Sequence, residues 1–526
     1  MKIWIMSGAM CAASALLTLP ALAAAPADEQ PVKFNVSGFA IQGENPLSNP
    51  RTLKVLAPFL GPQEGIDGVR KAADALQAAL ANAGYSFYRV VVPPQTLKDG
   101  EVVLEVKPFV LGTVTVTGNQ FYSEANIRRS LPALIEGKSP DARAITRALG
   151  VANMIPTKRE AVTFARSREP GKVDAEITVR DRDPRQAYVW LNNTGNEDTG
   201  DTRLGIGLQH HNLFDRDHVL TLTYTTAPEE TDKVSQYGLN YEIPLYGLGG
   251  RFSGYAVYSD VDTGTVGDFF NVSGSGEFYG LRYAHILPKW GELRQRLIFD
   301  LADKLFDNEA EFSGVPVGVD VKSRPLSLQY LTEWDARRTS GHFLLGYYRN
   351  LDGGEFNDED SYAASRVGAD PEWSAWRAGA SLRLPLAGQW LISALLDAQY
   401  ANEPLIPGEQ FGVGGLASVR GFEEREITGD RGVMGRLELW SPPFGERFRA
   451  GVFLDGGYVA RLEPQAGERQ NVAVASAGIG ANWDWRTNLS AQLYYAYVLE
   501  GLDDTLPGET ADGDSKVHFS IIYRFF

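Results

Sequence analysis

Cysteine is almost absent from this sequence: among its 526 residues only Cys11 carries a thiol. Cys11 lies in an N-terminal apolar segment that ends near Leu19, and Ala21-Leu22-Ala23 follows with small residues in an A-x-A arrangement. These features predict a secretory signal peptide over residues 1–23. Because its cleavage would remove Cys11, the mature chain is expected to have neither disulfide bonds nor thiolate chemistry.

Long apolar runs are missing after the signal peptide, since no later segment reaches eighteen consecutive apolar residues. This argues against a membrane-spanning helix. Basic residues are outnumbered: 50 Lys and Arg stand against 66 Asp and Glu, which gives a net charge of −16 and argues against a nucleic-acid partner. A soluble globular protein fits these figures, and so does a membrane β-barrel. The 55 glycines and 22 tyrosines favour the barrel, which uses tight turns and aromatic girdles.

After a short linker, residues 24–32, the chain reads as two similar units, residues 33–108 and 109–183. Each shows the order strand, helix, helix, strand, strand, and each is long enough for a small α+β domain. In the first unit the apolar residues of 66–83 recur at spacings of three and four, which predicts an amphipathic helix. A strand is expected next over residues 86–92.

From Pro184 onward the helical period disappears and alternation of apolar and polar residues takes its place, as in Leu489–Leu499 and Val517–Phe525. At about 21 residues per strand with its connection, residues 184–526 accommodate roughly 16 antiparallel strands, an even number. A soluble β-sandwich or propeller is the alternative. The aromatic strand that runs to Phe526 favours a membrane barrel.

Two stretches of the barrel region predict an internal ion pair. In Phe448–Val459, Asp455 falls on the polar face of a strand whose other face is apolar, because successive side chains of a strand point to opposite sides. Arg420 lies in a glycine-rich stretch without helix or strand period. We therefore expect a loop, about residues 403–431, to fold into the barrel and to be held there by an ion pair.

These stretches resemble the motifs of two-partner secretion transporters (TpsB), which belong to the superfamily of outer-membrane barrels preceded by polypeptide-transport-associated (POTRA) domains. Gly84-Tyr85, Val92-Pro93-Pro94-Gln95 and Gly100 are similar to the pattern of the family's first POTRA domain. The loop tip matches at Val419, Arg420, Gly421 and Phe422, and the barrel-wall motif matches at Phe453, Asp455 and Gly457. The resemblance implies two POTRA domains followed by a transmembrane antiparallel β-barrel, with Arg420 paired to Asp455.

The resemblance also implies a function. The chain would be a monomeric translocation pore in the outer membrane of a Gram-negative bacterium, in contact with its lipids, with the POTRA domains in the periplasm. It would bind a large TpsA-like exoprotein and secrete it without acting as an enzyme, and with no cofactor and no metal. We expect the cargo to add to an edge of the first POTRA sheet, at Tyr85, Ser86, Phe87, Arg89 and Val91.

Three alternatives bear on this interpretation. A barrel-assembly insertase of the same superfamily would carry more POTRA units, and a diffusion porin would need neither the POTRA pair nor Arg420. His210-His211 lacks a third ligand at useful spacing, so we expect solvated loop residues there and not a metal site.

Family members often carry an N-terminal helix that plugs the pore. Here only about eight residues separate the predicted cleavage site from Phe34, which is too few for a plug helix of several turns. Either the inward loop alone closes the pore, or gating differs.

Overall fold

The computed structural model describes residues 32–525 apart from 197–198, 262, 267–269, 274, 308–310, 313–314, 317–318, 337–338, 446, 486–487 and 503–507. The predicted signal peptide and Phe526 therefore lie outside the described residues. Within the described part, no helix is long and apolar enough to cross a membrane.

The first N-terminal domain forms a compact unit of its own. Its three-stranded sheet has the order β2-β5-β4, in which β4 pairs antiparallel with β5 and leaves its other side as a sheet edge. Helix α2 buries Leu76 and Leu80 in this domain. The elements are β1 (Lys33–Val36), β2 (Gly38–Gly43), α1 (Asn49–Leu56), β3 (Gly61–Glu64), α2 (Asp67–Asn82), β4 (Tyr88–Val91) and β5 (Glu101–Pro108).

Two strand boundaries in this domain differ from the prediction. The first strand, expected over residues 34–41, is divided at Ser37. Its N-terminal part, β1, pairs with β3 and not with the main sheet. The strand expected over residues 86–92 begins only at Tyr88. Gly84 ends the preceding helix in the left-handed region with φ +101°, so the chain turns over residues 84–87 before it can extend.

The second N-terminal domain has a three-stranded sheet of the same connectivity, with the order β6-β8-β7, and shows the predicted order of strand, helix, helix, strand, strand without counterparts of β1 and β3. Side chains cap both of its helices: Ser123 accepts a hydrogen bond from the amide of Asn126, and Asp141 accepts from the amides of Arg143 and Ala144. The elements are β6 (Val110–Thr117), α3 (Glu124–Ser130), α4 (Ala142–Ala152), β7 (Lys158–Arg166) and β8 (Lys172–Asp181).

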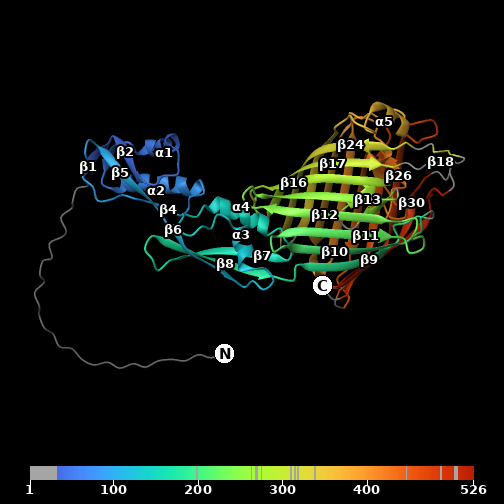
Figure 1. The fold of residues 1–526 in the computed structure, drawn as a ribbon, viewed down its shortest axis with the longest axis horizontal. Coiled ribbons are helices and arrows are strands. Elements are labelled where there is room, and N and C mark those ends of the chain that lie inside the picture. Colours follow the sequence, from blue (N-terminus) through green and yellow to red (C-terminus); the bar gives the residue numbers. More distant parts are fainter. Residues whose placement is uncertain are drawn as a thin grey trace, which may run out of the picture. The chain divides into compact units, whose positions relative to one another are not determined.

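The remaining strands form a closed antiparallel barrel, drawn in green to red in Figure 1. Over the described residues the barrel has sixteen strands, since β20 and β21 follow each other along β17 and together make one strand. β31 closes the barrel against β9 through five residue pairs. The wall strands are β9 (Arg185–Asn192), β10 (Arg203–Leu213), β11 (His218–Thr226), β12 (Gln236–Leu245), β13 (Gly250–Ser259), β16 (Gly276–Ile286), β17 (Leu293–Phe306), β20 (Val321–Ser323), β21 (Pro325–Ala336), β22 (Thr339–Asn350), β23 (Ser374–Pro385), β24 (Leu391–Ala401), β27 (Arg431–Trp440), β28 (Phe448–Ala460), β29 (Asn471–Trp485), β30 (Leu489–Glu500) and β31 (Ser515–Arg524).

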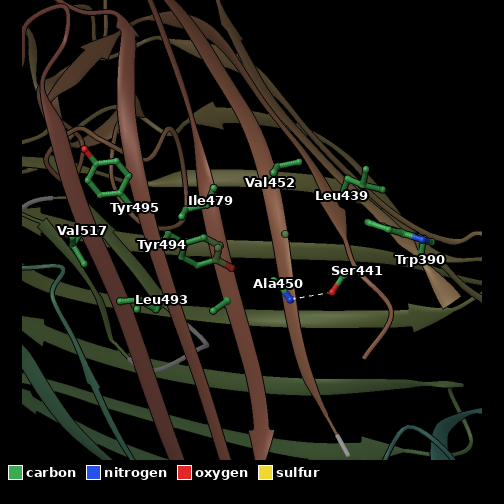
Figure 2. Close-up of a pocket in the computed structure, with 13 residues that line it drawn as sticks. Trp390, Leu439, Ser441, Ala450, Val452, Ile479, Leu493, Tyr494, Tyr495 and Val517 are labelled. Carbon is green, nitrogen blue, oxygen red and sulfur yellow. Dashed lines mark hydrogen bonds between the residues drawn. The ribbon is translucent and has the colours of Figure 1, made fainter. Parts of the chain in front are cut away.

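The two faces of the wall differ as the alternation predicted. On β28, Val452 and Leu454 point outward and are 54% and 52% exposed, whereas Asp455 points inward and is 1% exposed. Figure 2 shows part of the outer face across β27 to β31, where a shallow depression of about 670 Å³ is lined almost entirely by apolar side chains such as Ile479 and Leu493. An outer face of this composition suits contact with lipid chains.

Buried polar contacts attach the second N-terminal domain to the barrel turns. Lys158 Nζ on β7 lies 2.7 Å from an oxygen of Asp217, in the turn between β10 and β11, and 2.8 Å from Glu160. Asn126 donates to the other Asp217 oxygen at 2.9 Å, and the hydroxyl of Tyr246, after β12, donates to Asp217 as well. This cluster holds two carboxylates against one ammonium, and burial raises the pKa of Glu160 although Lys158 lowers it.

Candidate functional site

An inward-folded segment, residues 402–430, connects β24 to β27 and carries the candidate site. Its two arms pair as β25 (Phe411–Val413) and β26 (Ile427–Gly429), which places residues 414–426 at the tip. The segment lies within a residue of the predicted loop, and its tip contacts inward-facing side chains of the wall. We call residues 402–413 and 427–430 the stem and residues 414–426 the tip.

At the tip, Arg420 and Asp455 form the predicted ion pair. Arg420 Nε lies 2.7 Å from Asp455 Oδ2, Nη2 lies 2.8 Å from Oδ1, and the Arg420 amide also donates to Oδ2 at 3.2 Å. Arg420 is 0% exposed and Asp455 is 1% exposed. This two-pronged geometry uses the planar fork of arginine, which a lysine lacks.

Phe453 of the predicted wall motif and two wall residues that the sequence analysis did not identify, Glu438 and Tyr494, complete the surroundings of Arg420. Its Nη1 donates to Glu438 on β27 at 2.8 Å. Its Cζ lies 3.6 Å from the ring centre of Phe453 and 4.5 Å from that of Tyr494 on β30, so two aromatic faces enclose the cation. The alternation of β27 contained a signal for Glu438, because Leu437 and Leu439 flank it on the outward face.

The small residues of the two motifs provide space for this approach. Gly457 faces the segment so closely that a Cβ there would lie 2.5 Å from Val413 Cγ1 and 3.2 Å from Val419 Cγ2. Gly421 has φ +103°, a conformation that suits glycine, and a Cβ on it would meet Val498 at 3.1 Å. Phe422 is 0% exposed within the apolar cluster around the tip. Each of the seven motif residues thus contributes to packing or pairing of the tip.

The last strand of the barrel also contacts the tip. The amide of Gly421 donates to Nε2 of His518 on β31 at 2.9 Å. His518 is 1% exposed, and its role was not predicted because alternation alone shows only that it faces inward. The tip is therefore bonded to β27, β28 and β31 at once.

Additional ion pairs hold the inward-folded segment along its length. Glu409 in the stem is 1% exposed and lies 2.8 Å from both Lys304 on β17 and Arg377 on β23. Near the tip, Glu423 pairs with Lys516 on β31. The segment is therefore fixed to opposite parts of the wall, and the Arg420–Asp455 pair is one of several attachments.

The predicted cargo-binding edge maps only in part onto a strand. Arg89 and Val91 lie in β4, whereas Tyr85, Ser86 and Phe87 lie in the turn that precedes it. Phe87 instead stacks on Phe164 of the second N-terminal domain, with ring centres 4.6 Å apart.

Two glutamine side chains form hydrogen bonds with main-chain groups on this side of the first sheet. Gln77 of α2 accepts a hydrogen bond from the amide of Val90 at 3.2 Å. Gln95, in the predicted motif, bonds both the amide and the carbonyl of Val103 on β5, at 2.7 and 2.8 Å, beyond the end of β4. Since the Val90 amide points outward, the amides of Arg89 and Val91 point toward β5, because the direction alternates along an antiparallel strand.

The prediction for His210 and His211 was wrong. Both lie within β10 and not in a loop, and His211 is 3% exposed. Only the outward face of β10 is apolar. The polar residue His211, which is buried on the strand, was therefore misinterpreted as part of a loop. In the described part of the chain, no group of His, Cys, Asp and Glu is arranged to hold a metal ion.

A family model described as haemolysin secretion/activation protein ShlB/FhaC/HecB matches residues 171–483, more than half of the chain. The chain belongs to this family. A second model, the ShlB-type POTRA domain, matches residues 34–108. This family member is therefore an outer-membrane transporter of the TpsB type, with its POTRA domains in the periplasm, as the motifs predicted.

Individual relatives agree with the family assignment. Outer membrane transporter CdiB of Escherichia coli O6:K15:H31 (strain 536 / UPEC) is 24% identical over 444 residues, which cover 81% of this chain and 73% of the relative. Heme/hemopexin transporter protein HuxB of Haemophilus influenzae (strain 86-028NP) is 20% identical over 419 residues, 77% of this chain and 72% of the relative. The solved structure of CdiB from Escherichia coli matches with a TM-score of 0.66 at 19% identity, covering 95% of this chain and 92% of that structure. The predicted POTRA-plus-barrel fold is confirmed.

Proposed function

We propose that this transporter binds one large secreted exoprotein through its POTRA domains and passes it through the barrel to the cell surface. The observation that carries this proposal is the wall-bound tip, Val419 to Phe422, in a chain with the domain order of the TpsB family. A diffusion porin does not require a buried arginine that fixes an internal segment to the barrel wall, whereas a channel that must admit a polypeptide needs an internal segment that can be displaced.

The cargo is a segment in extended conformation that adds to the edge of the first POTRA sheet at β4. Main-chain hydrogen bonds of an added strand give affinity with few demands on sequence, which suits a partner that arrives unfolded. Arg89 and Val91 would lie beside the added strand. Tyr85 and Ser86, in the turn before β4, would contact it at its end.

Secretion of the partner in cells tests the proposal. A strain that expresses the transporter and the exoprotein encoded beside it should release that exoprotein into the medium. Removal of residues 33–108 should stop release while the barrel still assembles. The exoprotein would then accumulate in the periplasm or be degraded there.

The same experiment separates the proposal from an insertase function. If the chain were an insertase, its loss would lower the amounts of many outer-membrane barrels. The proposal requires that these amounts stay unchanged and that only the partner is lost from the medium. A general decrease in barrels with normal release of the partner would refute it.

A further inference from the structure

A second buried ion pair, separate from the one at the tip, lies at the outer end of the barrel. Arg366 follows α5 (Glu359–Ser365) in the segment 351–373 that connects β22 to β23, at the end of the barrel remote from the second POTRA domain (Figure 1). Its Nη1 lies 2.5 Å from Asp430 Oδ1 and its Nη2 lies 3.0 Å from Asp430 Oδ2. Arg366 is 8% exposed and Asp430 is 0% exposed.

This pair also bonds main-chain groups of the stem and of the connection after β28. Arg366 donates to the carbonyl of Leu405 at 2.8 Å and to that of Leu462 at 2.9 Å. Asp430 accepts from the amide of Leu405 at 2.8 Å and from the amide of Leu462 at 2.7 Å. Leu405 lies close to the start of the stem and Asp430 is its last residue. Both ends of the inward-folded segment are therefore bonded to segment 351–373 and to the connection after β28.

Apolar packing surrounds the same place. Tyr362 and Trp373 of segment 351–373 and Leu405 and Ile406 of the stem are all 0% exposed, so water does not reach them. They belong to one cluster that extends to Phe306 on the inner face of β17. Trp373 Nε1 donates to the Tyr362 hydroxyl at 3.2 Å, which fixes the two rings against each other.

We propose that Arg366 and Asp430 form the latch of an outer gate, distinct from the Arg420–Asp455 pair at the tip. The gate consists of segment 351–373 packed on the stem. Because the latch bonds both ends of the stem to segment 351–373, neither can leave the mouth of the barrel while the pair is intact. Loss of one partner leaves the other charge buried and unpaired, which favours separation of the two segments and entry of water.

Channel recordings of the purified protein in planar bilayers test the latch directly. Arg366→Leu and Asp430→Asn should each raise the fraction of time in which the channel is open several-fold over the unmodified protein. Arg366→Lys keeps the positive charge but lacks the planar fork of arginine, so its open fraction should lie between those of the unmodified protein and Arg366→Leu. Arg469→Leu is the matched control, because Arg469 forms a similar two-pronged pair with Glu509, and these two residues lie in the connections after β28 and β30 and not in the stem or in segment 351–373.

A second measurement covers variants whose conductance is hard to interpret. Ala369→Cys introduces a thiol beside the latch, where the native side chain is 8% exposed. A membrane-impermeant maleimide should label it slowly in the otherwise unmodified mature protein and several-fold faster when Arg366→Leu is added. Electrophoretic mobility before and after heating verifies that each barrel is folded.

Equal open fractions and equal labelling for Arg366→Leu, Asp430→Asn and Arg469→Leu would overturn the proposal. Neither measurement uses a cargo protein. A failure here would therefore leave the proposed secretion function untouched, and a failure of secretion would not decide whether the latch exists.

Discussion

The guanidinium of Arg420 replaces its water shell by Asp455, Glu438 and two aromatic rings, all within the barrel wall. Removing one member of a buried pair costs about 3–5 kcal/mol, mainly because the other charge is left without a partner. Arg420→Ala and Asp455→Ala should therefore free the tip and impair secretion while the barrel still assembles. The stem should stay in place, since Arg366 and Lys304 hold it independently.

A double-mutant cycle measures this coupling. The readout is secretion together with labelling of a thiol introduced by Ala417→Cys at the tip. The double variant Arg420→Ala/Asp455→Ala should lose much less than the sum of the two single losses. Additive losses would mean that Arg420 acts on something other than Asp455.

Gly457 offers a test that leaves every charge in place. A methyl group at this position would lie 2.5 Å from Val413, so Gly457→Ala should push the stem away from the wall and destabilise the docked segment by about 1–3 kcal/mol, as overpacking does. Adding Val413→Ala should restore part of the loss. Labelling through Ala417→Cys measures both effects, and an unchanged rate in Gly457→Ala would contradict the close packing described here.

The sequence alone predicted the central ion pair of this site but not all the residues around it. Arg420 and Asp455 were predicted because they stand in short motifs and because strand alternation separates inward from outward residues. Tyr494, His518 and Glu438 were not predicted. They come from three different parts of the barrel, and strand register decides which inward residues meet the tip. Register depends on hydrogen bonding between strands, which a single sequence does not display.

At the scale of elements, β4 lies at the edge of its sheet, but one main-chain amide on that edge is already hydrogen-bonded to a side chain of α2. Gln77 occupies the outward amide of Val90, so an added strand must displace this side chain. Gln77→Ala should therefore raise the affinity for the N-terminal domain of the exoprotein about fivefold, in line with about 1 kcal/mol for one hydrogen bond. Isothermal titration of the purified partners measures the change.

Gln77→Glu is the matched control because its carboxylate keeps an acceptor for the Val90 amide, and its affinity should stay close to that of the unmodified protein. Equal affinity in Gln77→Ala would indicate that cargo docks elsewhere. A proline at Arg89 is a poorer test, since the amide of Arg89 points toward β5 and its loss would weaken the sheet itself.

The junction of the second POTRA domain with the barrel should respond to pH. Burial raises the pKa of Glu160 above that of an unfolded chain, so the folded state binds a proton more tightly and stability falls as pH rises above about 4. Glu160→Gln removes the excess carboxylate and should abolish this decrease. Calorimetric unfolding midpoints of the POTRA domains at pH 5 and pH 8 test it. A decrease of equal size in both proteins would assign the effect to other groups.

Element order was predicted more accurately than element boundaries. The order strand, helix, helix, strand, strand follows from hydrophobic period; the second N-terminal domain shows it, whereas the first adds the short strand β3 between its helices and divides its first strand into β1 and β2. The start of β4 was misplaced because Tyr85 and Phe87 have high strand propensity, whereas both lie in the turn after Gly84, where Phe87 packs against Phe164 of the second domain. Such tertiary preferences override local propensity.

For the molecule as a whole, the proposed outer gate bears on the question of a plug. If the stem and segment 351–373 form that gate, trimming the residues before Val32 should leave the conductance of the purified protein in planar bilayers unchanged. The trimmed protein that also carries Arg366→Leu should have the same conductance as Arg366→Leu alone. A marked rise on trimming alone would show that the N-terminal residues close the pore.

The polar cluster that joins the second POTRA domain to the barrel limits how the molecule can be recombined. Lys158 and Asn126 on one side match Asp217 and Tyr246 on the other, so a replacement second POTRA domain that lacks Lys158 and Asn126 would leave Asp217 buried without these partners. The first POTRA domain contributes no residue to this cluster and is therefore the simpler module to exchange. A chimaera joined near residue 108 keeps the cluster intact and should fold, whereas one joined near residue 183 keeps it only if the incoming domain supplies an ammonium and an amide at the same places.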